Sequence, residues 1–273
     1  MKQWILIPAL ALALALLSGC ATSPTGRSQL LLVSPEQAIS ASAEAYVETL
    51  KPLEKEGKVD SDPKTLGRVQ LITGKIISQA IQAYPETKDW KWSVKVIDEP
   101  ENINAWCMAG GKMAIYTGLL NEVDPTDDEL AQVMAHEVAH ALSNHTAEKM
   151  SVALASQIGL IGVAIAADDS KYRQLAMTGA ALAATYAIQM PNSRTAETEA
   201  DRIGIELAAK AGYNPDAAVS LWHKMQKASG GGPPEFLSTH PAPSNRIKAL
   251  GELAPQVRPY YQENTPRPIY RFK

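Results

Sequence analysis

Hydrophobic residues recur with helical spacing in two segments of the first third of the chain. Residues 34–56 begin with Ser34 as a capping residue and Pro35 at the first helical position, which together predict a helix start. Residues 69–80 place apolar side chains three or four positions apart, which predicts one face of a second amphipathic helix that ends before Pro85. The apolar positions of that face are Val69, Ile72, Ile76 and Ala80.

The pattern changes to alternation between residues 92 and 117. Apolar and polar side chains alternate over residues 92–97, and residues 112–117 form a second short segment of this kind. Between them, residues 104–107 predict a strand that leads into a tight turn at Gly110 and Gly111. The expected fold class is therefore α+β, mainly helical, with a small sheet in which residues 112–117 form an edge strand.

Two alanine-rich apolar runs, residues 152–167 and 175–188, flank the polar segment 168–171. Each run is short for the roughly 20 residues that a membrane-spanning helix needs, and alanine is only weakly hydrophobic. A membrane hairpin is one interpretation of this pattern. A pair of buried core helices is the interpretation that we favour.

The first 20 residues have the order of a targeting segment. A positive charge is followed by an apolar run over residues 4–17, and small residues then precede Cys20. This order resembles a bacterial lipobox, with residues 1–19 as the signal peptide and residues 20–33 as a tether lipidated at Cys20. A buried apolar helix and an ordinary signal with an incidental cysteine are the alternatives. Ala21 stands where inner-membrane lipoproteins typically carry aspartate, which favours the periplasmic face of the outer membrane of a Gram-negative bacterium.

Composition narrows the classes of function. The chain has 273 residues, 45% of them hydrophobic and 20% charged, which suits a globular protein with a buried core. A net charge of −3 without a basic stripe argues against a nucleic-acid partner. Lipidation of Cys20 would leave Cys107 without a disulfide partner. We interpret Cys107 as a small buried residue rather than as a nucleophile.

The strongest chemical signal is the segment His136-Glu137-Val138-Ala139-His140. Thr126 and Glu129 form a capping box that starts a helix through this segment, and we expect the helix to run to about Met150. Two histidines four apart on a helix share a face, so one zinc ion can bind both. Glu137 then lies where a carboxylate can take a proton from metal-bound water. Solvated histidines on an ordinary helix are the alternative.

A third histidine ligand is not expected on the same helix. In a His-Glu-x-x-His-x-x-Gly-x-x-His pattern, Ser143 stands where glycine is needed and Thr146 where the last histidine is needed. His145 is one position off that pattern. We therefore interpret His145 as a surface residue of the helix or as a residue that supports the ligands from behind.

A carboxylate ligand is expected from a later helix, which begins at Arg194. Glu197 and Asp201 lie four apart on it and share a face, so one of them can bind zinc while the other orients a zinc-bound histidine. Glu199 points elsewhere. A solvated acidic helix face is the alternative for this run.

Taken in order, these motifs resemble the signature of peptidase family M48. The family includes the CAAX prenyl protease, the membrane heat-shock protease and the Oma-type peptidases, and the chain is most similar to its bacterial lipoprotein members. The resemblance covers roughly residues 25–253. The matching positions are Asn104-Ala105 with Gly110-Gly111, His136 to His140, Glu197 to Gly204, Ala211 to Pro215, and Thr239-His240-Pro241 with Arg246.

The resemblance implies a zincin-like metallopeptidase core over residues 34–254, with a small β-sheet beside the His-Glu-x-x-His helix and an irregular tail over residues 255–273. It also implies one Zn2+ per chain. The implied zinc ligands are His136, His140 and Glu197, with Glu137 as general base and later proton donor and Asp201 as the residue that orients a histidine ligand.

Two further residues, His240 and Arg246, are implied to face the site. His240 stabilises the oxyanion in one interpretation, and in another it occupies the open position of zinc and keeps the enzyme latent. A loop histidine bonded to the backbone is the alternative.

The implied function is that of a membrane-anchored periplasmic zinc metalloendopeptidase whose substrates are unfolded or misassembled envelope polypeptides. The edge strand would take an extended peptide by strand addition, with Asn104, Gly110 and Gly111 as substrate-binding residues. A plain structural hairpin is the alternative for this region. From another class of function, the chain would be a zinc-binding chaperone or assembly factor with latent protease activity.

Overall fold

The computed structural model describes residues 20–166, 192–228, 235–241, 245–263 and 265–272. The chain divides into two compact units, one made of residues 1–41 with 146–190 and the other of residues 42–145 with 191–273. The expected signal peptide and the second alanine-rich run, residues 175–188, lie outside the described residues.

The larger unit, residues 42–145 with 191–273, contains a three-stranded sheet with the order β3-β5-β4. Its strands are β3 (Ser93–Ile97), β4 (Ala105–Met108) and β5 (Lys112–Tyr116). β5 pairs in parallel with β3 and antiparallel with β4, so it is the central strand. The prediction that residues 112–117 lie at the sheet edge is therefore wrong, and β4 is the edge strand. Met113, Ala114 and Ile115 are all buried, so both faces of this central strand are covered.

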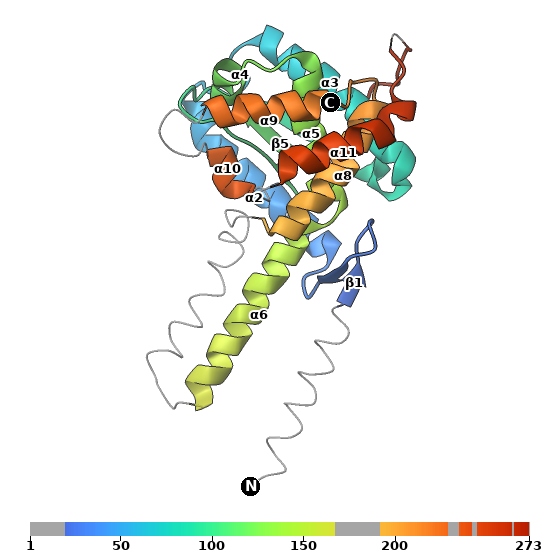
Figure 1. The fold of residues 1–273 in the computed structure, drawn as a ribbon. Coiled ribbons are helices and arrows are strands. Elements are labelled where there is room, and N and C mark those ends of the chain that lie inside the picture. Colours follow the sequence, from blue (N-terminus) through green and yellow to red (C-terminus); the bar gives the residue numbers. More distant parts are fainter. Residues whose placement is uncertain (1–19, 167–191, 229–234, 242–244, 264, 273) are drawn as a thin grey trace. The chain divides into compact units, whose positions relative to one another are not determined.

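Helix α5 (Asp127–Leu142) is the central helix of this unit. The longer helices around it are α3 (Pro63–Ala83), α8 (Arg194–Lys210), α9 (Ala217–Ala228) and α11 (Arg246–Val257). Helix α5 contacts α3, α8, α9 and strand β4, and α11 packs against both α8 and α9 (Figure 1). The short helical elements are η1 (Pro85–Asp89), α4 (Thr117–Glu122), α10 (Glu235–Thr239) and η2 (Arg258–Tyr260). The predicted α+β class, mainly helical with a small sheet, is confirmed.

The start of α5 follows the sequence prediction, but its end does not. Thr126 and Glu129 form the capping box, since each side chain accepts a hydrogen bond from the backbone amide of the other. The helix ends at Leu142 rather than near Met150, because Asn144 takes a left-handed conformation with φ of 54°. A new helix, α6 (His145–Ala166), starts at the next residue.

The smaller unit joins an N-terminal hairpin to the first turns of α6. Strands β1 (Cys20–Thr22) and β2 (Ser28–Leu30) pair antiparallel. Arg27 forms a two-point ion pair with Glu148 of α6, with nitrogen–oxygen distances of 2.7 and 2.6 Å. Helix α2 (Pro35–Lys55), predicted from its capping serine, begins in this unit and continues into the larger one.

The first alanine-rich run forms the body of α6. Residues 152–157 of this run are exposed or half-buried, so the expectation of a buried core helix is wrong for this stretch. Its small side chains bury little apolar area, and the gain that would draw the run into a core is correspondingly small. Over the part of the chain that the structure describes, no helix is both long and apolar enough to cross a membrane.

The C-terminal tail contacts α3 at Gly74. The amide of Tyr270 donates a hydrogen bond to the carbonyl oxygen of Gly74 at 2.9 Å. A side chain at position 74 would not fit there, because an added Cβ would lie 2.6 Å from the carbonyl oxygen of Tyr270. Tyr270 and Phe272 are half-buried against the core. The expectation of an irregular tail over residues 255–273 is wrong for its start, because residues 255–257 belong to α11 and residues 258–260 form η2. Residues 265–272 have no regular secondary structure, and they pack within the larger unit.

Candidate metal centre

Two histidines of α5 form the base of the site. Both side chains are buried, and their spacing of four residues places them on one face of the helix. The Nε2 atoms of His136 and His140 are 3.0 Å apart. Two imidazoles whose same ring nitrogens approach so closely are arranged to share one cation.

Glu197, in the first turn of α8, completes the predicted set of three. Its Oε2 lies 3.2 Å from Nε2 of His136, and its Oε1 lies 3.2 Å from Nε2 of His140. The side chain is fully buried. Ser193 caps the start of α8, which fixes where this first turn begins.

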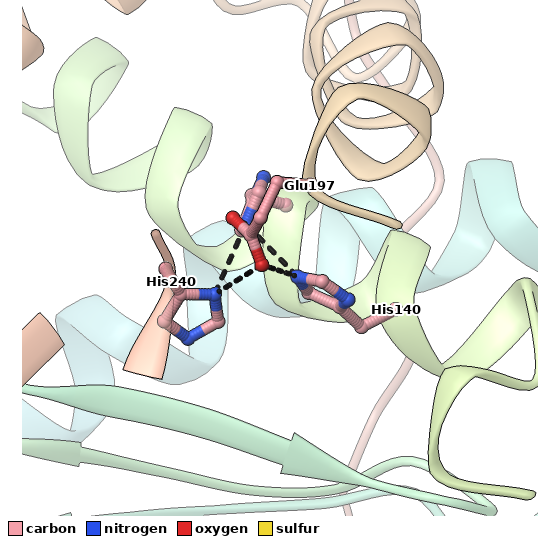
Figure 2. A group of neighbouring side chains, drawn as sticks. His140, Glu197 and His240 are labelled. Atoms are coloured by element: carbon pink, nitrogen blue, oxygen red, sulfur yellow. Dashed lines mark hydrogen bonds and ion pairs between the residues drawn. The ribbon is translucent and has the colours of Figure 1, made fainter. Parts of the chain in front are cut away.

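His240, which follows the short helix α10, contributes a fourth donor atom (Figure 2). Its Nδ1 lies 3.1 Å from Oε1 of Glu197 and 3.4 Å from Nε2 of His136. Its ring stacks on Phe236 with the centroids 4.4 Å apart. The structure thus brings His240 into the group itself, with donor atoms from all four residues within 4.8 Å of one another.

The distances within this group fit a tetrahedral metal ion. Bonds of about 2.0–2.1 Å, as zinc makes to histidine, put neighbouring ligand atoms about 3.3–3.4 Å apart. The contacts given above range from 3.0 Å between the two α5 histidines to 3.4 Å between His136 and His240, and all four donor atoms lie within 4.8 Å of one another. Nitrogen and carboxylate oxygen donors are also the ligands that zinc prefers. These residues therefore form a possible metal site of the appropriate size.

The charges among these residues oppose one another. Burial disfavours the charged form of His136, but Glu197 and Asp201 outweigh it and raise the pKa of His136 to about 9. Burial lowers the pKa of His140 well below its ordinary value. Burial also opposes ionisation of Glu197, but His240, His140 and His136 hold its pKa well below the usual range. Positive charge at the centre of the group stabilises the buried, ionised carboxylate of Glu197, and a bound cation would supply that charge.

Asp201 and Arg246 lie behind His136. The Oδ1 atom of Asp201 is 3.1 Å from Nδ1 of His136, which leaves Nε2 facing the group. Arg246, the first residue of α11, donates to Oδ1 of Asp201 at 2.5 Å and to Oε2 of Glu197 at 3.2 Å. Its guanidinium stacks on Trp222, 3.8 Å from the ring centroid. Arg246 therefore holds the two carboxylates of α8 in place.

Glu137 lies beside the group without belonging to it. Its side chain is 1% exposed, and its Oε1 is 3.5 Å from Nε2 of His240. Being adjacent to His136 on α5, it projects about 100° around the helix from that residue. A carboxylate in this position can exchange a proton with a molecule held at the metal site.

The structure places His145 and Glu199 in this region as well. Nδ1 of His145 is 2.7 Å from Nδ1 of His140, and Nε2 of His145 is 3.1 Å from Oε2 of Glu199. Both residues are buried. Of the two interpretations offered for His145, the one that sets it behind the ligands is confirmed. Glu199 does point away from Glu197, as expected, but toward a histidine. The Ser143-Asn144 pair, which tolerates a helix break, is the sequence signal that could have revealed the contact of His145 with His140 and Glu199.

The predicted substrate-binding residues lie in the β4–β5 hairpin. Asn104 is buried, and its side chain accepts a hydrogen bond from the amide of Ala105. Gly110 and Gly111 have φ values of 75° and 74° and form the tight turn, with Gly111 packed against Trp92. These contacts explain the local backbone geometry, and the substrate role of these residues stays a prediction.

Cys107, on β4, is half-buried. Burial and the nearby carboxylate of Glu137 raise the pKa of its thiol well above the ordinary value. The thiolate is the nucleophilic form of cysteine. A thiol that stays protonated at neutral pH fits a packing role better than a nucleophilic one.

A glycine sets the spacing between the two helices that carry the site. An added Cβ on Gly204 of α8 would lie 3.0 Å from both the Cα and the backbone nitrogen of His136. Glycine at position 204 lets α8 approach the backbone of α5 this closely, and a larger residue would require a shift of a few tenths of an ångström.

Together the fold and the site define a class, that of metallopeptidases with a His-Glu-x-x-His helix and a glutamate from a second helix. Comparison with known families gives the same result, since the model of peptidase family M48 matches residues 63–254. The chain belongs to peptidase family M48.

Curated relatives agree with this assignment. The chain is 36% identical over 246 residues to the mitochondrial metalloendopeptidase OMA1 of Bos taurus, which covers 85% of this chain and 45% of that protein. It is 34% identical to the mitochondrial metalloendopeptidase OMA1 of Homo sapiens, with coverage of 85% and 45%. The beta-barrel assembly-enhancing protease of Escherichia coli (strain K12) is 32% identical over 165 residues, which cover 58% of this chain and 34% of that protein. The chain thus spans half or less of the length of these relatives.

Proposed function

We propose that the protein is a zinc-dependent endopeptidase. The observation that carries the proposal is the convergence of His136, His140 and Glu197 on one point, with Glu137 beside it. A site that held zinc only for structure would have no need of a buried carboxylate adjacent to its ligands. The family supports the same activity, because relatives that match most of this chain are named metalloendopeptidases.

Each residue of the site has a defined part in the proposed reaction. His136, His140 and Glu197 hold the metal, which when bound supplies a Lewis acid that acidifies water and polarises the scissile carbonyl. Glu137 accepts the proton of the attacking water and passes it to the nitrogen of the leaving amine. Asp201 keeps the proton of His136 on Nδ1, so that Nε2 is free to bind. Arg246 neutralises the charge of Glu197 and Asp201 within the buried site.

Strand β4 is the proposed docking site for the substrate backbone. It contacts α5 and, among the described residues, pairs on one side only, with β5. Its outer edge can therefore pair with an extended peptide through main-chain hydrogen bonds, which read no side chain. Asn104, Gly110 and Gly111 shape the ends of this strand. Backbone recognition of this kind suits unfolded polypeptides of varied sequence.

The proposed setting is the bacterial envelope. The segment up to Cys20 has the order of a lipoprotein signal, which supports a lipid anchor at the periplasmic face of the outer membrane. The name of the Escherichia coli relative, a beta-barrel assembly-enhancing protease, supports the same compartment. Misfolded or misassembled envelope proteins are the substrates that we propose on these grounds.

A second function is favoured by one specific observation. Nδ1 of His240 is close enough to Glu197 and His136 to be a fourth ligand. A site with all positions filled by protein has no place for water, so the resting protein would bind zinc and client polypeptides without cutting them. In this alternative the protein is a zinc-binding chaperone or assembly factor with latent protease activity.

The test is cleavage of an unfolded protein such as casein by the purified full chain in mild detergent, with bound metal quantified in parallel. The comparison variant is Glu137→Gln, which keeps the size of the side chain and removes its ability to take a proton. Glu252→Gln, at an exposed position of α11, controls for the loss of one negative charge. We expect equal zinc in all three proteins and cleavage lost only in Glu137→Gln.

Other outcomes separate the alternatives. Zinc without cleavage in every protein would favour the latent binding factor. Absence of zinc from the unmodified chain would refute the proposed function as a whole.

A further inference from the structure

The helix break at Ser143 and Asn144 brings a third histidine against the metal group. In one continuous α-helix, residues five apart project about 140° from each other, because successive residues are about 100° apart. His145 would then point away from His140. The left-handed conformation of Asn144 turns the chain instead, so that the two Nδ1 atoms lie 2.7 Å apart.

Glu199 meets this histidine from the other side. Its Oε2 is 3.1 Å from Nε2 of His145, and both side chains are almost completely buried. Residues two apart on a helix project about 200° from each other. Glu199 and Asp201 thus leave α8 in nearly opposite directions, and each reaches a different histidine.

With Glu199 ionised and His145 neutral, the chemistry of these groups sets the direction of the hydrogen bonds. An ionised carboxylate only accepts, so Glu199 requires a proton on Nε2 of His145. A neutral His145 then has a lone pair on Nδ1, which accepts from Nδ1–H of His140. His140 is left with its lone pair on Nε2, the atom that faces Glu197 and His136.

We propose that His145 and Glu199 are positioning residues that hold His140 in the tautomer and orientation able to bind metal. The proposal rests on the proposed metal-binding function and deepens it. Asp201 does the same for His136 by direct contact. The site therefore supports each of the two α5 ligands with a carboxylate from α8, once directly and once through a histidine.

The first test reads the tautomer directly in the zinc-loaded full chain. The sequence has five histidines, so selective 15N-histidine labelling gives a simple two-bond 1H–15N spectrum. We expect His145 as the Nε2–H tautomer and His140 as the Nδ1–H tautomer, with the His145 signals assigned by their loss in His145→Gln. A proton on Nδ1 of His145 would overturn the proposal.

The second test measures zinc affinity by competition with a chelator. Contacts that orient a metal-bound histidine are typically worth about 10–100-fold in affinity, and we expect losses in this range for Glu199→Gln and for His145→Leu. Matched controls are Glu206→Gln on the same helix, where Glu206 pairs with Lys210, and His223→Leu at an exposed position of α9. Neither control is expected to change zinc affinity.

The double variant Glu199→Gln/His145→Leu distinguishes a relay from two independent contributions. Because Glu199 acts through His145, its loss should cost little more once His145 is gone, so the double variant should bind zinc about as weakly as His145→Leu alone. Additive losses would overturn the proposal. Glu199→Gln keeps the size of the side chain, so the test stands even if His145→Leu does not fold.

Thermal unfolding of the metal-free variants excludes a merely structural role. Such a role would lower the unfolding temperature without zinc and leave the zinc affinity of the folded protein unchanged, which would overturn the proposal. Full affinity in both single variants would do the same while leaving the proposed peptidase function intact. If the unmodified chain binds no zinc, the proposed role of His145 and Glu199 and the proposed peptidase function fail together.

Discussion

At the scale of single residues, the site is organised by what stands behind each ligand. His136 contacts Asp201, His140 contacts His145, and Glu197 accepts a hydrogen bond from Arg246. His240 differs, because its ring packs on Phe236 and it follows a short helix rather than lying within a long one. Its position in the group therefore depends least on the central helices. Removing His240 tests whether it blocks the metal position.

We expect His240→Ala to raise basal proteolysis several-fold. The substitution removes a nitrogen that lies within reach of the metal position, and it frees that position for water. The measurement is the initial rate of casein cleavage at equal zinc loading. A fall to the level of Glu137→Gln would instead assign His240 to stabilisation of the oxyanion, and an unchanged rate would contradict both roles.

At the scale of elements, the position of α5 depends on its capped start. Glu129 accepts hydrogen bonds from the Thr126 amide, from Ser220 and from Lys224, so the cap also ties α5 to α9. Burial opposes ionisation of Glu129, but Lys224 and Ser220 outweigh it and lower its pKa from the ordinary 4.5. Stability from this group is present above pH 4.5 and is lost as the pH falls through the lower, folded-state pKa.

Glu129→Gln should therefore lower the free energy of unfolding at pH 7 by about 1–2 kcal/mol. The difference from the unmodified protein should shrink as the pH falls below 4.5 and through the lower folded-state pKa of Glu129, because protonated Glu129 is uncharged like glutamine. Urea unfolding at pH 7 and at pH 3 measures this, with Glu252→Gln as the exposed control. A difference that stays constant with pH would show that the charge of Glu129 does not matter.

The contact between α5 and α8 leads to a prediction about metal binding. Gly204→Ala introduces a Cβ 3.0 Å from the backbone of His136, so α8 must shift outward by a few tenths of an ångström. Although alanine favours helices by about 1 kcal/mol over glycine, we expect weaker zinc binding, because Glu197 moves with α8.

Gly251→Ala is the matched control, since its added Cβ meets only Val219 at 3.9 Å. Chelator competition gives the zinc affinity, and thermal unfolding of the metal-free protein reports on the helices. Equal zinc affinity in Gly204→Ala and in the control would mean that α5 and α8 tolerate a wider spacing.

Features set by neighbouring residues are the ones that the sequence predicts well. The capping box of α5 and the shared face of His136 and His140 depend only on positions within one helix, and both are confirmed. The central place of β5 is different, because it depends on which strands meet across the fold, and alternation within one segment does not encode that. The contact of Glu199 with His145 required both the break at Asn144 and the packing of α8, neither of which follows from periodicity.

At the scale of the larger unit, the C-terminal tail packs against an early helix of the chain. Tyr270 bonds to Gly74 of α3, so the last described residues lie against a helix from the first third of the chain. The tail continues past the end of α11 at Val257. It thereby adds a stabilising contact between segments far apart in sequence.

Gly74→Ala should release this tail. An added Cβ would lie 2.6 Å from the carbonyl oxygen of Tyr270 and 3.0 Å from Cγ2 of Ile269. Gly67→Ala in the same helix is the control, because nothing lies within 4 Å of its added Cβ, and there alanine should only stabilise the helix. Hydrogen exchange over residues 265–272, measured by mass spectrometry, should become faster in the first variant alone. Unchanged protection would mean that the tail adapts without detaching.

The close approach at Gly204 also bears on which ion the protein accepts. Two ligands come from one rigid helix and are fixed relative to each other, whereas Glu197 comes from the neighbouring helix. The distance across which the carboxylate must reach is then set by backbone meeting backbone, with no side chain between them to yield. The spacing between the two helices therefore limits the radius of the cation that His136, His140 and Glu197 can bind together.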